Sequence, residues 1–174
     1  MIMDPEEFKS LLDEYRIKKH KGDTLRHKKY EEQNSGLMSL NFEIDIKRGC
    51  LLIGKLTHKS DDLDCIVSVI LEGKDDTFDL YKGASVTSGF DDDGQLTYYI
   101  KSEYVDDSNI SRLPNILKIS NNIKLKIKFF PDDSRSAEIS LSHKQVAIIK
   151  DTLDFYIELK SMCENKLGVN EKVR

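Results

Sequence analysis

The feature of the sequence that most constrains its fold is an uninterrupted helical pattern over residues 142–167. This stretch contains neither proline nor glycine, and Gly168 follows it. Ser142 and Gln145 have the S-x-x-Q spacing of a capping box, in which each side chain satisfies the other residue's backbone N–H. Glycine suits the position just after a helix C-terminus. The pattern predicts one long helix that ends near Gly168.

Two apolar stripes run along this predicted helix. Residues that recur with the 3.6-residue period form the first stripe: Val146, Ile149, Leu153, Tyr156, Ile157, Cys163 and Leu167. A second stripe lies beside it and consists of Ile148, Phe155, Leu159 and Met162. An apolar arc this wide exceeds what one sheet face covers. We expect the first stripe to lie on a sheet, and we interpret the second as a partner-binding face for the N-terminal helix, a second subunit or another protein.

The N-terminal sequence predicts a second helix. Asp4 is a good N-cap, Pro5 suits the first helical position, and two glutamates follow in the first turn. Three lysines and a histidine precede Gly22, which we expect to end this helix. Residues 23–36 are interpreted as a hinge, with two helical turns over residues 24–32. The predicted organisation is therefore an N-terminal helix and basic hinge over residues 1–36 and a β domain with the C-terminal helix over residues 37–174.

Between residues 37 and 141 the apolar period changes from 3.6 to two. Apolar residues at 40, 42, 44 and 46 alternate with polar ones, and those at 123, 125, 127 and 129 alternate with three lysines. Turn sequences separate such runs, whereas residues 83–94 look irregular and 113–116 look like a short edge segment at Pro114. We predict an α+β fold with an antiparallel sheet of about seven to eight strands, a meander that forms a curved half-barrel or a sandwich, packed on the long helix.

Charge is distributed unevenly along the chain. The net charge is −4, but residues 16–29 contain seven basic residues against one aspartate, so this segment carries +6 and the rest of the chain −10. The seven basic residues are candidate phosphate contacts for nucleic-acid binding: Arg16, Lys18, Lys19, Lys21, Arg26, Lys28 and Lys29. Two other interpretations are a solvated helix end that complements the acidic remainder of the chain, and a docking surface for an acidic protein.

No motif for catalysis, metal binding or cofactor binding is recognisable. The acidic run at residues 91–94 resembles a calcium loop, but an EF-hand alignment on Gly94 places Gly89 and Ile100 at the required acidic positions. The four histidines show no metal-ligand spacing, and P-loop, GxGxxG and GxSxG sequences are absent. We therefore predict no catalytic residue, no metal and no cofactor, and we keep an enzyme with a dispersed site as an alternative.

The three cysteines show no CxxC spacing, and the N-terminal sequence lacks a secretory pattern, so we expect a cytoplasmic protein without membrane contact. The abundance of Asn, Lys, Ile, Asp and Ser is typical of an AT-rich genome, such as that of a Gram-positive bacterium or its phage. The first functional hypothesis is a non-enzymatic binding or assembly protein that acts through protein–protein contacts or self-association. The alternative is a nucleic-acid-binding accessory protein that uses residues 16–29.

Overall fold

The computed structural model describes residues 3–33, 38–47, 49–58, 65–74, 76–80, 85–90, 96–101, 110–119, 122–130 and 136–172. The predicted calcium-like run at residues 91–94 therefore lies outside the described residues. Within the described residues the chain forms an α+β fold with two antiparallel sheets, which confirms the predicted fold class. Eight strands, β3 to β10, lie within residues 37–141, where seven to eight were predicted, and two further strands, β1 and β2, precede them in the described residues.

The larger sheet has six strands in the order β1-β2-β3-β4-β8-β7. Their bounds are β1 Ile17–Lys19, β2 Thr24–His27, β3 Met38–Asp45, β4 Leu51–His58, β7 Ser85–Phe90 and β8 Leu96–Lys101. The smaller sheet has the order β10-β9-β5-β6, with β5 Cys65–Glu72, β6 Thr77–Asp79, β9 Lys124–Phe130 and β10 Ser136–Ser140. Strands β1 to β4 form a sequential meander, whereas the β4–β8 and β5–β9 pairs join strands distant in sequence.

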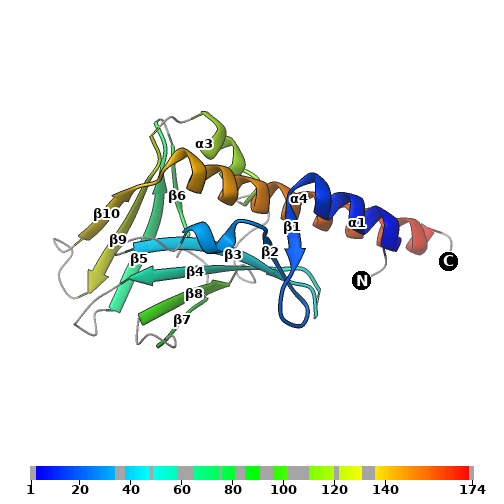
Figure 1. Ribbon diagram of the computed structural model, residues 1–174, viewed down its shortest axis with the longest axis horizontal. Helices are drawn as coiled ribbons and strands as arrows, with labels where there is room; N and C mark the ends of the chain where they lie inside the picture. The colour runs from blue at the N-terminus through cyan, green and yellow to red at the C-terminus, as the bar shows by residue number, and fades with distance from the viewer. Residues whose placement is uncertain are drawn as a thin grey trace.

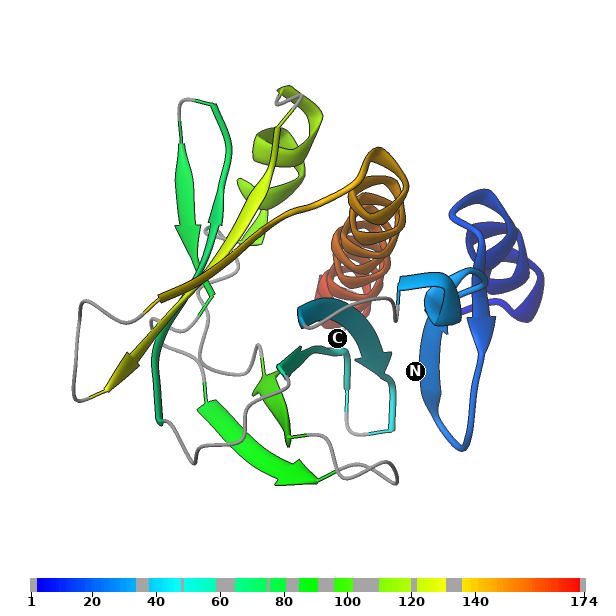
Figure 2. The ribbon, with the colours of Figure 1, turned by 60° about the vertical axis from the view of Figure 1, so that its left-hand side comes forward.

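Helix α4, His143–Lys172, runs roughly along the long axis of the molecule and lies between the two sheets (Figures 1 and 2). Its N-terminus has the predicted capping box, because the Ser142 N–H donates to Gln145 Oε1 at 2.8 Å and the Gln145 N–H donates to Ser142 Oγ at 3.1 Å. The helix contacts β2, β3, α1 (Pro5–Glu14) and α3 (Leu113–Ile119). Its C-terminal part extends beyond the sheets beside α1 (Figure 1).

The apolar core surrounds α4. Alternate residues of β3 face this helix, and Ile44 on β3 is fully buried together with Leu153, Phe155 and Leu159 on α4. Burial of each such side chain contributes about 1.5–3 kcal/mol relative to exposure. The predicted spine of the fold is thus confirmed, since the described residues of both apolar stripes of α4 are either buried in the core or partly buried against it. The helix nevertheless continues through Gly168 to Lys172, so the predicted end at Gly168 is wrong.

The prediction for residues 15–27 is also wrong, although a 3-10 turn does form at Tyr30–Gln33. Helix α1 ends at Glu14, and Arg16 has a positive φ of 58°, which turns the chain into β1. Ile17 is buried at this point, and residues 24–26 pair with β3 instead of forming a helical turn. The period-two signal was hidden because β2 buries Arg26 and His27 where a strand normally shows an apolar and polar alternation.

Two further predicted segments differ from the structure. Residues 85–90, predicted to be irregular, form β7, and residues 113–119, predicted to be an edge segment, form helix α3. Pro114 fits α3 because proline is tolerated in the first turn of a helix, where its missing N–H has no intrahelical partner. The domain division at residue 36 stays a prediction, although the pairing of β2 with β3 crosses that boundary.

Candidate functional site

A cluster of buried charges lies on the face of the larger sheet that points away from α4. The register places Arg26 on β2 opposite Glu43 on β3. Arg26 Nη2 donates to Glu43 Oε1 at 3.0 Å, and Lys55 Nζ on β4 lies 2.9 Å from the same oxygen. The guanidinium also stacks over the ring of Tyr30 at 4.1 Å and reaches Glu31 Oε1 at 2.9 Å. These contacts join β2, β3, β4 and the 3-10 helix η1, Tyr30–Gln33.

The contacts of this cluster indicate a structural role rather than a catalytic or phosphate-binding one. Burial and the neighbouring Glu43 carboxylate raise the pKa of Tyr30 well above its usual range, so its hydroxyl stays protonated at neutral pH. Arg26, predicted as a phosphate contact, is buried and engaged by two carboxylates. A buried guanidinium that is already paired cannot reach a phosphate without breaking the β2–η1 contact.

A second buried polar pair joins the sheet to α4 on the opposite face. His27 Nε2 lies 2.9 Å from Asp151 Oδ2, and the Lys29 backbone N–H donates to His27 Nδ1 at 3.0 Å. Because Nδ1 accepts a hydrogen bond from a backbone N–H, the ring proton belongs on Nε2, which donates to Asp151. Both ring nitrogens are thus occupied. This pair resembles a catalytic dyad in composition, but the His27 ring has no free lone pair with which to act as a general base.

The remaining predicted phosphate contacts lie on the surface. We name residues 16–29 the basic hairpin, since they contain β1, β2 and their turn. Six of its seven basic side chains belong to exposed residues. Three of these have described contacts: Arg16 lies 3.3 Å from Asp151, Lys28 lies 4.0 Å from Asp13, and Lys19 lies over the Phe8 ring. Lys18, Lys21 and Lys29 take part in no ion pair with the residues that the structure describes.

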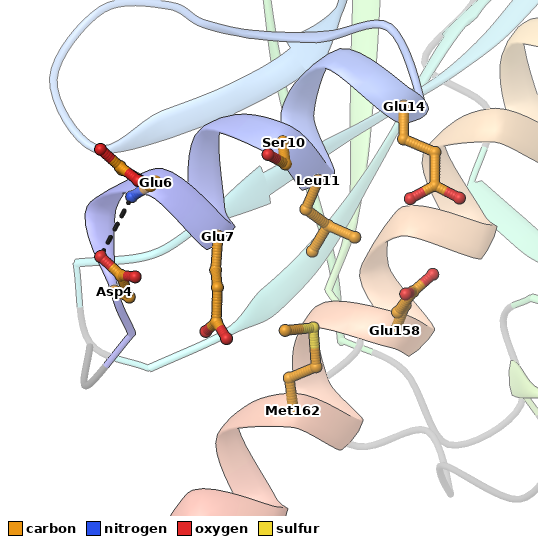
Figure 3. A pocket seen from close by; sticks show the side chains of 8 residues that line it. All are labelled: Asp4, Glu6, Glu7, Ser10, Leu11, Glu14, Glu158 and Met162. Atoms are coloured by element: carbon orange, nitrogen blue, oxygen red, sulfur yellow. Dashed lines mark hydrogen bonds between the residues drawn. The ribbon is translucent and has the colours of Figure 1, made fainter.

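An open groove of about 390 Å³ lies between α1 and the C-terminal half of α4 (Figure 3). Leu11 of α1 and Met162 of α4 point toward each other across it, and Ser10 adds a hydroxyl to its wall. Five carboxylates also line it: Asp4, Glu6, Glu7, Glu14 and Glu158. We name this site the acidic groove. Among the described residues that line it, none is a lysine, arginine or histidine, and acidic residues surround a small apolar floor.

Two contacts within the chain position the carboxylates of the acidic groove. The Asp4 carboxylate caps α1 by accepting the Glu6 N–H at 3.2 Å. The Tyr15 hydroxyl donates to Glu158, which ties α1 to α4 and raises the pKa of Tyr15 well above its usual range. Tyr15 also packs edge-to-face on Phe155, with ring centroids 6.2 Å apart. Both contacts of Tyr15 hold the end of α1 against α4 beside the groove.

The predicted partner-binding face is divided between the core and this groove. Ile148, Phe155 and Leu159 are buried within the chain, whereas Met162 is partly exposed and lines the groove. The face contacts the end of α1 through the Tyr15–Phe155 ring pair. Contact with the N-terminal helix is one of the alternatives predicted for this face. Sequence reasoning missed the acidic residues. Their signal was the spacing of Glu7, Leu11 and Glu14, which places them on one side of α1.

Comparison of the chain with protein-family models, curated proteins and solved structures finds no match. Within the described residues, no group of three or more His, Cys, Asp or Glu side chains is arranged to hold a metal ion. No helix in the described part of the chain is both long and apolar enough to cross a membrane.

Proposed function

We propose that this chain is a non-enzymatic binding protein that holds a protein partner at the acidic groove. The observation that carries the proposal is an open groove in which five acidic residues lie around the partly exposed Met162, with the buried Leu11 beneath it. An apolar centre surrounded by a polar rim is the usual anatomy of a protein contact. Phe155 and Leu159 of the predicted partner-binding face are buried. The proposed contact surface therefore retains Met162 of that face and adds the acidic residues of α1 that line the groove.

The polar clusters elsewhere support binding rather than catalysis. The His27–Asp151 pair has both ring nitrogens occupied, and Arg26 and Glu43 are engaged with each other in a buried network. Among the described residues that line the acidic groove, Ser10 supplies the one hydroxyl, and none is a histidine or lysine that could activate it. An enzyme with a dispersed site remains the less favoured alternative.

Site-specific photocrosslinking tests the proposed function. A photoreactive phenylalanine analogue replaces Ser10 in the groove or, as the control, Ser136 on β10, which lies at the other end of the molecule (Figure 1). The full chain is then irradiated in an extract of the cells that encode it. We expect a protein adduct at position 10 that is absent at position 136 and is lost in the Glu14→Lys variant. Equal labelling at both positions, or no adduct at position 10, would refute the proposal.

Nucleic-acid binding by the basic hairpin is a second candidate function. It is favoured by six exposed basic residues within one two-stranded ribbon. Fluorescence anisotropy with labelled single- and double-stranded DNA and RNA tests it as a function of salt. Each phosphate contact contributes a slope of about 0.7–0.9 in log K against log salt, so Lys18→Ala/Lys21→Ala should lower the slope by about 1.4–1.8. Absence of binding at low salt to every one of these ligands would exclude this function.

A further inference from the structure

The two sheets end in four edge strands, and three of these carry features that discourage pairing with another chain. Strands β1 and β6 are only three residues long, and β1 ends in two exposed lysines. Strand β10 carries Glu138, which forms ion pairs with Lys124 and Lys126 on β9. Short length and charged side chains are the usual protection of an edge strand. These three edges are therefore poor templates for a further strand.

The fourth edge strand, β7, lacks this protection. Its sequence is SVTSGF, which contains no charged residue and no proline. All six residues pair with β8, from Ser85↔Lys101 to Phe90↔Leu96, and β8 is the one neighbour of β7 among the described strands. Figure 1 shows β7 at the lower margin of the molecule. An extended strand that is paired on one side presents backbone N–H and C=O groups to another chain on the other.

An apolar side chain is exposed at the end of this open edge. Phe90, the last residue of β7, is 70% exposed and is the one exposed large hydrophobic side chain among the described residues. Beside it, no atom beyond the sequence neighbours lies within 4 Å of the place that a Cβ on Gly89 would occupy. The end of β7 thus combines an uncovered aromatic ring with free space for a residue of a strand laid against it.

A second copy of β7 fits this edge better than another edge of the same chain. Two copies of one edge pair about a two-fold axis and close as a dimer, whereas β7 against a different edge would repeat head to tail and grow into a filament. A charge near such an axis would face its own copy, and β7 carries no charge.

The order of residues in β7 also suits pairing with itself. In an antiparallel register centred on Ser88, Phe90 stands opposite Val86 of the second copy, and Gly89 stands opposite Thr87. Each pair occurs twice because of the two-fold axis. An aromatic residue opposite a β-branched one is a favourable cross-strand pair. The free space at Gly89 leaves room for the residue opposite it.

We propose that two copies of this chain pair through β7 in antiparallel register, which joins their larger sheets into one continuous sheet. The contact uses neither the acidic groove nor the basic hairpin, so this inference goes beyond the proposed function and is independent of it. Backbone hydrogen bonds and the Phe90 ring supply the contact. Because no ion pair contributes, a change of salt concentration should alter the association little.

Photocrosslinking and sedimentation of the full chain test this pairing. A photoreactive phenylalanine analogue replaces Phe90, and unlabelled chain is mixed with isotope-labelled chain, so that mass spectrometry separates crosslinks between copies from those within one copy. Sedimentation equilibrium measures the mass at up to about 1 mM protein, which covers weak association. The edge variants are Phe90→Lys and, from the other side of the strand, Gly89→Lys. The control is Thr77→Lys, which adds a lysine at an exposed residue of the edge strand β6. Circular dichroism verifies that each variant is folded.

We expect the unmodified chain and the control to approach twice the monomer mass of 20.0 kDa as the concentration rises, at low and at high salt. Crosslinks between copies should map to β7 around Val86. Each edge variant should associate at least about tenfold more weakly, because a lysine on the edge blocks strand pairing.

Four results would overturn the proposal: a monomer at every concentration, a mass that grows past the dimer, crosslinks between copies that map outside β7, or a folded edge variant that associates as the unmodified chain does. If the purified chain is monomeric and position 90 crosslinks a different protein in a cell extract, another extended segment occupies β7 and the self-pairing is wrong. None of these results bears on the proposed function, which depends on the adduct at position 10.

Discussion

Removal of the Glu43 carboxylate is predicted to destabilise the fold far more than an ordinary loss of one ion pair. The Glu43 side chain is 6% exposed and accepts contacts from Arg26 at 3.0 Å and Lys55 at 2.9 Å. In the Glu43→Ala variant the Arg26 guanidinium, 9% exposed, keeps Glu31 as its described carboxylate partner, and that residue is largely in water. Removing one partner of a buried pair costs about 3–5 kcal/mol, because the other charge is left without compensation.

The size of this effect is large relative to the stability of a domain. A free energy of unfolding of about 5–15 kcal/mol is typical, so the variant should lose a substantial part of it. At about 2–4 °C per kcal/mol for a chain of this length, the melting temperature should fall by about 6–20 °C. Equilibrium unfolding in urea, followed by circular dichroism, measures the loss. The Asp154→Ala variant is the control, since its partner Lys150 is one turn away on α4 and partly exposed.

A double substitution separates the cost of an unpaired buried charge from the value of the pair. Arg26→Met/Glu43→Leu removes both charges and retains much of their volume. Arg26 Nε is also buried without a hydrogen-bond partner among the described residues, so its removal relieves a desolvation cost. The Lys55 side chain is 27% exposed and can turn its ammonium group to water. We expect the double variant to lie within about 1–2 kcal/mol of the unmodified chain.

Either variant can contradict the predicted cost of leaving Arg26 without Glu43. A loss below about 1 kcal/mol for Glu43→Ala would mean that water already compensates the guanidinium, as it does for exposed pairs. A double variant as unstable as the single one would mean that the charges contribute a net attraction that apolar packing cannot replace.

Three other predictions concern α4 and the smaller sheet. Phe155→Ala should lower the free energy of unfolding by about 3–5 kcal/mol in urea titrations, since the ring is fully buried; a loss below about 1 kcal/mol would contradict its place in the core. Tyr15→Phe should cost about 1–3 kcal/mol through the lost Glu158 hydrogen bond and should speed proteolysis at α1; unchanged protection would show that this bond does not hold the helix. The hydrogen bond from Lys126 holds the pKa of Glu72 below its usual range, so this contact stabilises the fold above the unfolded pKa of about 4.3 and is lost as the pH falls through the folded value. Lys126→Met should therefore raise the carboxyl pKa of Glu72 in an NMR titration, and an unmoved pKa would assign the shift to another cause.

The long C-terminal helix and the regular strands were predictable because their signals are local. The capping box at Ser142 and the 3.6-residue period of α4 depend on neighbours along the chain, as does the alternation in β3 and β9. The expectation that Phe155 and Leu159 would be covered followed from the width of the apolar arc alone. The function, the source and the cytoplasmic location stay predictions.

The hairpin and the groove required the tertiary structure. Strands β1 and β2 are three and four residues long, and β2 buries Arg26 and His27, so no period of two marks them. The buried Arg26 is paired with Glu43, 17 positions away along the sequence. The buried His27 is paired with Asp151, 124 positions away. The groove likewise joins the first helix of the chain to its last. Patterns within a segment depend on its own backbone geometry and determine helices and strands, whereas charge pairing and surface shape depend on which distant segments meet in space.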